Sequence, residues 1–394
     1  MIPKGEEVEE RPYFPQEEYD QRLHNLRQLM AAQDLDACLI SSPENIFYLS
    51  GLSHQGFFAY HLLIVPCDGK LALICRAMER VTVEKWVVTP NRAIFYGFGD
   101  DDDPVHFTCA VLRQMRLGTA RLAMEKSSLF LPPRITEGIS DRLPQAKLGD
   151  CSGLVDSLRQ IKSARELDYT RQAAKVTNAM MNAAQETAAA GVSEQEIAAE
   201  VHRAMLLAGG TYPGFGPFIR ATPSLGEEHR TWSDHRLQPG EALFVELAGC
   251  INHYHAPMGR LLYIGAAPPG SEAMAQLCLE AFNSVVSTIR PGIKAGQVYQ
   301  AWQDVVDAAG LSHYRRHHCG YMVGLGFPPS WVGGPMVVGL RHGSDLELQA
   351  GMVFHVMSWL MGAGEGDYFV SDTAVVTQEG CEVITAVPQQ LFIV

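Results

Sequence analysis

The pattern of apolar residues changes near residue 160, and this change constrains the fold more than any other feature. Before it, short apolar runs alternate with helical stretches such as Tyr19 to Leu35. The runs are Ala37 to Ser42, Leu62 to Pro66, Leu71 to Cys75, Ala93 to Phe98 and Arg121 to Lys126. Strands of this length between helices predict an α/β domain of about 150 residues.

After the change, longer periodic segments follow, and they predict helices at Glu166 to Ala190, Ser193 to Ala208, Ser271 to Ile289 and Ala295 to Ala309. Ser163 with Glu166 three residues later forms a capping-box pattern at the start of the first. Strands are expected near Ala242 to Ala248, Arg260 to Ile264, Val353 to Met357 and Ala374 to Val376. Because 394 residues exceed one ordinary core, we expect an α+β chain with two domains, 1–155 and 156–394.

Charge and cysteine usage limit the classes of partner. The net charge of −13 disfavours nucleic acid, whose phosphates need a basic face, and also disfavours an anionic membrane surface. No apolar run reaches the length of a membrane span, and the acidic start MIPKGEEVEERPYF lacks the apolar segment of a signal peptide. The nine cysteines are scattered without paired spacing. These features predict a cytoplasmic protein with reduced thiols.

Four phrases carry a family resemblance: LQPGEALFVELAG (237–249), HHCGYMVGLGFPPSW (317–331), GMVFHVMSW (351–359) and DYFVSDTAVVT (367–377). In this order they resemble the pita-bread family of aminopeptidase P, prolidase and creatinase. The segment from Asp36 to Gly51 resembles the N-terminal domain of the same family. The resemblance implies a C-terminal pita-bread fold, in which helices cover a curved antiparallel sheet, and an N-terminal α/β creatinase-like domain. It also implies a homodimer.

Metallopeptidases of this family bind two divalent ions with two Asp, one His and two Glu. By resemblance, the matching positions here are Glu246, Pro257, Tyr321, Met357 and Ser371. Only the first is a carboxylate, and two hard dications need several anionic oxygens or imidazoles. We therefore expect no metal and no other cofactor. The alternative is a shifted alignment that hides true ligands, and it requires every phrase to slip independently.

Two residues are the catalytic candidates. His229 stands eight residues before Leu237, where the family carries a His, and in the metal-independent creatinase the matching His acts as the base. Imidazole suits proton transfer near neutral pH. Glu246 lies in the apolar phrase ALFVELAG, so its carboxylate should be buried and should meet a cation or have a raised pKa. The carboxylate could bind a cationic substrate or attack an electrophilic carbon directly, and a structural ion pair is the alternative role for this glutamate.

A second set of residues is predicted to bind substrate: Tyr321, Trp331, Trp359, Arg260, His318, His255 and Phe57. Aromatic walls suit a small planar cation. An arginine would pair with a substrate carboxylate, and Arg220, Arg230 and Arg341 are equal candidates with Arg260. His253 and His255 form an H-x-H pair that could also hold a metal, although a polar hairpin edge is the simpler interpretation. By resemblance, Phe57 belongs to the loop 53–58, where a partner protomer would contribute to the cavity.

The phrases ELAGC-x-x-x-YH-x-P (246–257), GY-x-VG-x-G-x-PPSW (320–331) and VFH-x-M (353–357) resemble the ectoine hydrolase branch more than creatinase, which keeps a Glu where Met357 stands. The resemblance implies a metal-independent hydrolase that opens a small cyclic amidine, such as ectoine or 5-hydroxyectoine, to N-acetyl-2,4-diaminobutyrate. Two alternatives remain open. One is a metal-dependent Xaa-Pro dipeptidase or aminopeptidase with rearranged ligands, and the other is a non-catalytic binding module.

Overall fold

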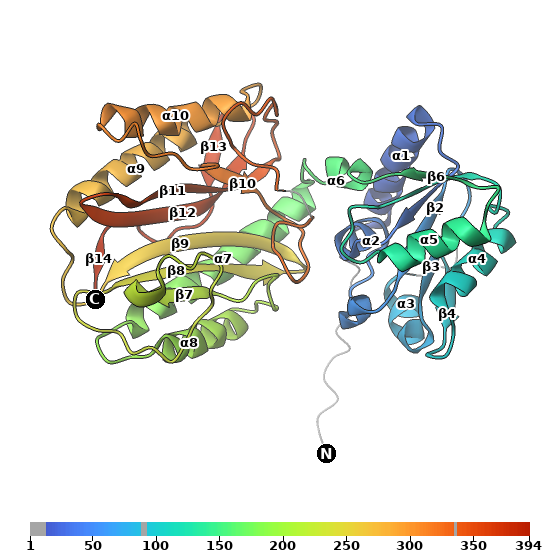
Figure 1. Cartoon of the computed structure of the whole chain (residues 1–394), viewed down its shortest axis with the longest axis horizontal. Coiled ribbons are helices and arrows are strands. Elements are labelled where there is room, and N and C mark those ends of the chain that lie inside the picture. Colours follow the sequence, from blue (N-terminus) through green and yellow to red (C-terminus); the bar gives the residue numbers. More distant parts are fainter. Residues whose placement is uncertain (1–12, 88–92, 335–336) are drawn as a thin grey trace, which may run out of the picture. The chain divides into compact units, whose positions relative to one another are not determined.

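The chain forms two compact units, Met1–Arg159 and Gln160–Val394. The computed structural model describes residues 13–87, 93–334 and 337–394 (Figure 1). The domain boundary expected at 155/156 lies four residues before this division, inside helix α6 (Leu154–Leu158). Each unit has its own sheet and its own apolar core.

The N-terminal unit is built on a six-stranded sheet in the order β4-β3-β2-β1-β5-β6. Its strands are β1 (Ala37–Ile40), β2 (Leu62–Pro66), β3 (Leu71–Arg76), β4 (Ala93–Phe98), β5 (Arg121–Met124) and β6 (Lys147–Asp150). Its helices, besides α6, are α1 (Gln16–Ala32), α2 (Pro43–Ser50), α3 (Arg80–Trp86), α4 (Pro104–Gln114) and α5 (Pro133–Arg142). The five predicted strands are confirmed to within two residues at their ends, and β6 was not predicted, because its residues are only partly buried and not continuously apolar.

The C-terminal unit is built on an eight-stranded sheet with the main order β10-β11-β12-β9-β8-β7, and β13 and β14 pair with β12 and β9. The strands are β7 (Phe218–Ala221), β8 (Ala242–Ile251), β9 (Tyr254–Tyr263), β10 (Gly320–Met322), β11 (Val353–Gly364), β12 (Gly366–Val376), β13 (Cys381–Val383) and β14 (Phe392–Ile393). The helices are α7 (Ala164–Thr187), α8 (Glu194–Leu207), α9 (Ser271–Thr288) and α10 (Ala295–Ala308). All the pairings are antiparallel except the short one between β14 and β9.

The four predicted long helices are confirmed. The Ser163 side chain accepts a hydrogen bond from the backbone N–H of Glu166, and the Glu166 carboxylate accepts one from the backbone N–H of Ser163, so the capping box fixes where α7 begins. Helices α7 and α8 cover the β8–β9 half of the sheet, and α9 lies against β11 and β12 with α10 packed on it (Figure 1).

Alternation along β8 decides which side chains face the helices. Leu243, Val245 and Leu247 belong to the core made with α7 and α8. Because successive side chains of a strand point to opposite faces, Phe244 and Glu246 face the other way. A charged residue in an apolar strand is therefore directed away from the helix-covered core.

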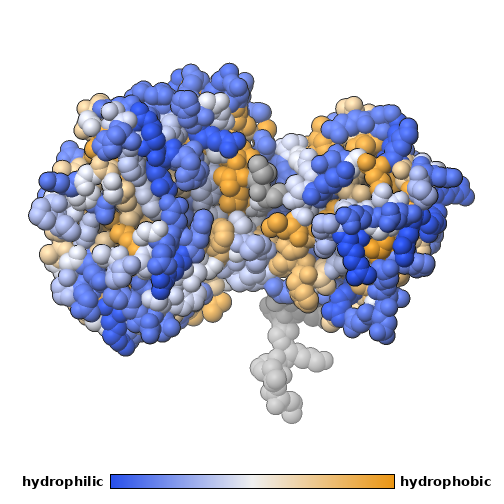
Figure 2. Space-filling model, viewed as in Figure 1, coloured by the Kyte–Doolittle hydropathy of each residue, from blue (hydrophilic) through white to orange (hydrophobic). Residues whose placement is uncertain are grey.

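Within the described part of the chain, no helix has both the length and the apolar character needed to cross a bilayer. The face of the surface shown in Figure 2 is mostly hydrophilic, with separate apolar patches. The most exposed large apolar side chains described in the N-terminal unit are Phe58, Met78, Val81 and Leu129.

Candidate active site

A row of residues crosses five neighbouring strands of the C-terminal sheet. Phe218 pairs with Glu246, which pairs with Gly259, which pairs with Ser371, which pairs with Met357. Residues that pair directly across antiparallel strands point to the same face. The row therefore contains three of the positions matched to family metal ligands: 246, 357 and 371. Their side chains lie in line on the same face of the sheet.

Gly259 makes this row possible because it has no side chain. A Cβ atom at this position would lie only 2.2 Å from the Phe369 ring and 2.9 Å from the Ser371 hydroxyl. Any larger residue would displace the aromatic ring or the hydroxyl. The glycine therefore lets the Phe369 ring and the Ser371 hydroxyl pack directly against the backbone of β9.

A hydrogen-bond chain ends at Ser371. The Trp331 indole Nε1–H donates to the Tyr321 hydroxyl at 3.0 Å, this hydroxyl lies 2.9 Å from His355 Nδ1, and His355 Nε2 lies 2.7 Å from Ser371 Oγ. An indole can only donate, so the tyrosine proton is free to point to Nδ1. His355 then carries its own proton on Nε2 and donates it to Ser371.

His355 stays neutral in this chain, since burial first, and then His318 and Arg260, lower its pKa to about 3. Its Nδ1 lies 4.0 Å from the nearest carboxylate oxygen of Glu246. Burial, and secondarily the charge of Glu246, raises the pKa of the Tyr321 phenol well above its ordinary value. The chain is therefore a set of neutral groups held next to one carboxylate.

The Glu246 carboxylate is almost completely buried, with 12% of its side chain exposed. Among the described residues, none donates a hydrogen bond to it. Burial raises its pKa to about 7, while Arg220 opposes the rise and Glu228 adds to it. A buried carboxylate without donors is a site for a cation or an N–H donor. The expected burial of Glu246 and its raised pKa are both confirmed.

Arg220 lies on the same face, one strand away. Its guanidinium sits 3.9 Å from the centre of the Phe244 ring, and it donates to the backbone oxygens of Leu225 at 3.1 Å and Glu228 at 2.8 Å. Its Nη2 atom is buried and has no hydrogen-bond partner in the described chain. The arginine is fully buried.

The structure places His229 in an exposed turn at the edge of this face. Its ring centre lies 5.9 Å from that of Phe218, which pairs with Glu246 in the row. No hydrogen bond joins the two catalytic candidates within the described chain. His229 is therefore a neighbour of the row and is open to solvent.

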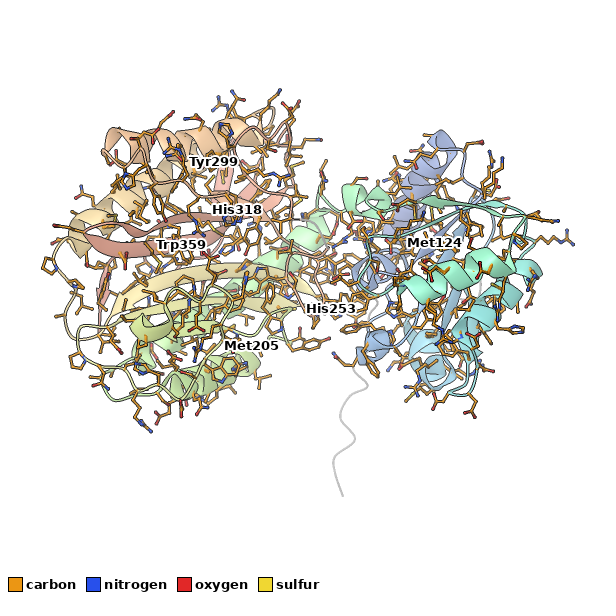
Figure 3. The ribbon with its side chains drawn as sticks, in the orientation of Figure 1. Met124, Met205, His253, Tyr299, His318 and Trp359 are labelled. Carbon is orange, nitrogen blue, oxygen red and sulfur yellow. The ribbon has the colours of Figure 1, made fainter. Side chains whose placement is uncertain are left out.

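The two histidines of the H-x-H pair do not act together. Asn252 and His253 have φ values of 49° and 68° and form the two-residue turn between β8 and β9, where positive φ is required at both positions. The His253 ring stacks on Phe327 at 3.9 Å, and Figure 3 shows this histidine at the end of the hairpin. The simpler interpretation, a hairpin edge, is confirmed.

The hydrogen bonds of His255 do not support the predicted role in substrate binding, because both ring nitrogens are already used. Nε2 accepts a hydrogen bond from the backbone N–H of Gly214 at 2.9 Å, and Nδ1 lies 3.3 Å from the backbone oxygen of Gly324. Burial lowers its pKa to about 4. This histidine joins β9 to the two loops that contain Gly214 and Gly324, and its ring has no free donor or acceptor.

The hydrogen bonds of Arg260 do not support its predicted role in substrate binding either. Its guanidinium donates five hydrogen bonds, to the backbone oxygens of Gly259, Ser371, Val387 and Pro388 and to the Asp372 carboxylate at 3.0 Å. A guanidinium has five N–H donors, so none remains for a substrate carboxylate. Arg260 instead locks β9 to β12 and to the C-terminal segment.

Phe57 does not present its ring to a ligand either. It is buried within the N-terminal unit, and its ring centre lies 5.8 Å from that of Phe130. The following residue, Phe58, is 78% exposed. The loop therefore offers the neighbouring aromatic and not the predicted one.

The remaining aromatic and histidine candidates surround the row. Trp331 packs at 5.7 Å from Phe218, and Trp359 lies along β11 with the Arg316 guanidinium 4.6 Å from its ring centre (Figure 3). The His318 ring centre lies 5.3 Å from that of Tyr321, and its buried Nδ1 has no partner in the described chain. Burial lowers the pKa of His318 to about 3.

The residues at the row do not fit a metal centre. In the described part of the chain, no group of three or more His, Cys, Asp or Glu side chains is placed to hold an ion. At the positions matched to family ligands, Tyr321 and Ser371 are engaged with His355, and Met357 and Pro257 offer no anionic oxygen. A single carboxylate cannot neutralise two dications.

His355 is not among the substrate-binding residues predicted from the sequence, yet it connects the hydrogen bonds of the row. It stands two residues before Met357, and the period of a strand already places both on one face. Its two hydrogen bonds could not be predicted, since Tyr321 and Ser371 come from other strands. The close packing of Phe369 and Ser371 against Gly259 was not predicted at all.

Two known protein families match this chain, and together they cover most of its length. The family model described as metallopeptidase family M24 matches residues 168–378, and the creatinase/prolidase N-terminal domain matches residues 22–161. The chain belongs to metallopeptidase family M24. Its C-terminal unit has the pita-bread fold, and its N-terminal unit is the creatinase-like domain, as the resemblance implied.

Relatives within family M24 include both peptidases and other hydrolases. An ectoine hydrolase of Halomonas elongata is 27% identical over 395 residues, covering 96% of this chain and 98% of the relative. An uncharacterised hydrolase/peptidase, y4tM, of Sinorhizobium fredii is 29% identical over 393 residues, covering 97% and 98%. The crystal structure of dipeptidase PepE from Mycobacterium ulcerans superposes with a TM-score of 0.81 at 23% identity, covering 97% of this chain and 99% of that one. The protein is a hydrolase of the M24 family.

Proposed function

We propose that this protein hydrolyses a C–N bond of a small cyclic amidine, of the ectoine or 5-hydroxyectoine type, to an N-acetyl-2,4-diaminobutyrate without the binuclear metal centre of the family. The observation that carries the proposal is the environment of Glu246. Its carboxylate is buried, receives no hydrogen bond from the described residues, and stands where family peptidases hold metal. An amidinium supplies what this carboxylate lacks, a delocalised positive charge with N–H donors.

The neighbouring groups suit the same ligand. Aromatic rings of Phe218, Phe244 and Trp331 line the face around the carboxylate, and aromatic faces attract planar cations. The neutral chain through Tyr321 and His355 adds no competing charge. The similarity to the Halomonas elongata ectoine hydrolase over nearly the whole chain supports the same class of substrate.

The chemistry needs no Lewis acid at the substrate, because the amidinium carbon is already electrophilic. Oxygen from water becomes bonded to this carbon, one ring C–N bond breaks, and the leaving nitrogen gains a proton, so that an amide and an amine result. Glu246 contacts the amidinium through this change and stabilises its charge. His229, exposed at the edge of the face, exchanges the protons with solvent.

A dipeptidase is the second candidate, because PepE and other M24 relatives bear peptidase names. That reaction requires a polarised peptide carbonyl, for which the family uses metal. The donor set at the row does not fit a metal, so the amidine remains the better candidate.

The test is to incubate EDTA-treated protein with ectoine and to follow the ring protons by NMR. We expect the ring signals to disappear as acetyl-diaminobutyrate signals grow. Glu246→Gln should lower turnover by about 100-fold or more, whereas Glu186→Gln, an exposed glutamate near the end of α7, should leave it unchanged.

Two outcomes would contradict the proposal. Full turnover in Glu246→Gln would remove the proposed role of the carboxylate. Activity on an Xaa-Pro dipeptide that appears only when Mn²⁺ or Zn²⁺ is added, with ectoine left intact, would return the protein to the metallopeptidases.

A further inference from the structure

The site contains a second buried charge that the proposed reaction does not use. Arg220 is fully buried, yet its Nη2 has no hydrogen-bond partner in the described chain. The charges of Glu246, Glu228 and Glu227 act on Arg220, but none of these carboxylates forms a salt bridge with it in the described chain. Buried polar groups without hydrogen-bond partners are rare in folded proteins. Such a group therefore indicates a ligand, and the ligand it requires is an anion.

The other arginines considered from the sequence do not have this property. Arg230 is exposed and pairs with Glu227 at 2.8 Å, and Arg341 is exposed. Arg260 uses all five donors. Arg220 alone among these four combines complete burial with an unused N–H group.

The position of Arg220 relative to Glu246 is fixed by the register of β7 and β8. Phe218 pairs with Glu246 and Arg220 pairs with Phe244, so the arginine and the glutamate are diagonal neighbours on one face. Diagonal neighbours in an antiparallel pair are separated by about 7–8 Å at the backbone. No salt bridge joins their side chains in the described structure, so both charges remain available to one small molecule.

We propose that Arg220 binds the carboxylate of the substrate while Glu246 binds its cationic ring, so that the site selects zwitterions. This inference rests on the proposed function and names the substrate class more narrowly: cyclic amidines that carry a carboxylate on the carbon next to a ring nitrogen. A guanidinium matches a carboxylate in shape and charge. The Phe244 ring under the guanidinium holds it in place.

The burial of the two groups also gives the direction of binding. The Glu246 side chain keeps 12% of its surface exposed, whereas Arg220 has none. In this arrangement the carboxylate of the substrate lies deeper in the unit than its ring. Because Nη2 is closed off in this structure, the side chains that cover it must move aside as the carboxylate arrives.

The experiment compares two ligands in the same protein. One is ectoine, and the other is the same methyl-tetrahydropyrimidine ring without its carboxylate. Both kcat/KM and the dissociation constant, from calorimetry, are measured for wild type, Arg220→Met, Arg220→Lys and the exposed control Arg230→Met. Comparing ligands within one variant cancels any loss of folded protein.

We expect wild type and Arg230→Met to prefer the carboxylated ring by at least about tenfold, since a charge-assisted hydrogen bond of this kind is worth about that factor or more. Arg220→Met should bring the ratio close to one, and Arg220→Lys should keep part of it. If Arg220→Met fails to fold, a reduced ratio in Arg220→Lys supports the inference and an unchanged ratio overturns it.

The outcomes separate this inference from the proposed function. Equal preference for both rings in wild type, or an undiminished preference in Arg220→Met, would overturn the role of Arg220 while amidine turnover still stands. Binding that depends on Arg220 without turnover would support the inference and remove the proposed reaction. Absence of both binding and turnover would overturn both.

Discussion

Replacing Glu246 by Gln should make the protein more stable at alkaline pH, because the fold holds this carboxylate where ionisation is unfavourable. Burial raises its pKa from 4.5 to about 7. Each unit between the folded and unfolded pKa corresponds to about 1.4 kcal/mol. The ionised carboxylate therefore costs the folded state about 3 kcal/mol at high pH, and a neutral amide of the same shape avoids this cost.

The pH window follows from the direction of the shift. Below pH 4.5 the carboxyl carries its proton in both the folded and the unfolded state, and it contributes no pH dependence. Between pH 4.5 and about 7 the folded state keeps a proton that the unfolded state has lost, so stability falls as pH rises. Above about pH 7 both states are ionised and the full cost remains.

Urea unfolding at pH 5 and pH 8.5 measures this difference. Four of the five tryptophans lie in the C-terminal unit, so tryptophan fluorescence mainly reports the unit that contains Glu246. We expect Glu246→Gln and wild type to be close at pH 5 and to separate by about 3 kcal/mol at pH 8.5. The exposed control Glu186→Gln should have the same unfolding free energy as wild type at both pH values. Parallel curves for wild type and Glu246→Gln across this range would refute an unfavourable buried carboxylate.

Three further substitutions test separate parts of the site. Tyr321→Phe removes the hydroxyl between an indole and an imidazole, leaving both unpaired; we expect a loss of about 1–3 kcal/mol in urea unfolding and at least about tenfold lower turnover in the NMR assay. Arg260→Met leaves a buried carboxylate without its cation and should cost about 3–5 kcal/mol in the same unfolding assay, whereas Arg230→Met should change little. His229→Ala, at an exposed position, should stay within about 0.5 kcal/mol of wild-type stability, yet lower turnover by about 100-fold in the same assay.

Local signals allowed most of the fold to be predicted from the sequence. The capping box at Ser163 depends on residues three apart, so it could be recognised in isolation. Strand β9 shows the limit of local signals. It was expected to begin at Arg260, but it begins at Tyr254. His255 and Pro257 interrupt the apolar alternation there, and only the long pairing with β8 makes these residues a strand.

The grouping of the candidate site positions on one face could be predicted, but the hydrogen bonds of their side chains could not. The family phrases place positions 246, 321, 357 and 371 together, and the register of the sheet joins them. Whether an arginine keeps an unused N–H group depends on backbone carbonyl groups that lie far away in the sequence. Arg260 is saturated by Val387 and Pro388, more than 120 residues along the chain, and no local pattern distinguishes it from Arg220.

Neutral residues stand at most of the row positions where the family peptidases have metal ligands, and the charges at these positions depend on one another. Several carboxylates placed within a few ångströms repel each other, and in the family peptidases two dications offset that repulsion. Without the ions, each added acid would raise the pKa of Glu246 further, because Glu246 is already buried and short of donors. Ser371 and Tyr321 satisfy the buried His355 with neutral hydroxyls, so they stabilise the row without adding negative charge. One carboxylate is then left to meet one cation, and this charge balance is what a singly charged amidinium requires and a dipeptide bound through two metal ions does not.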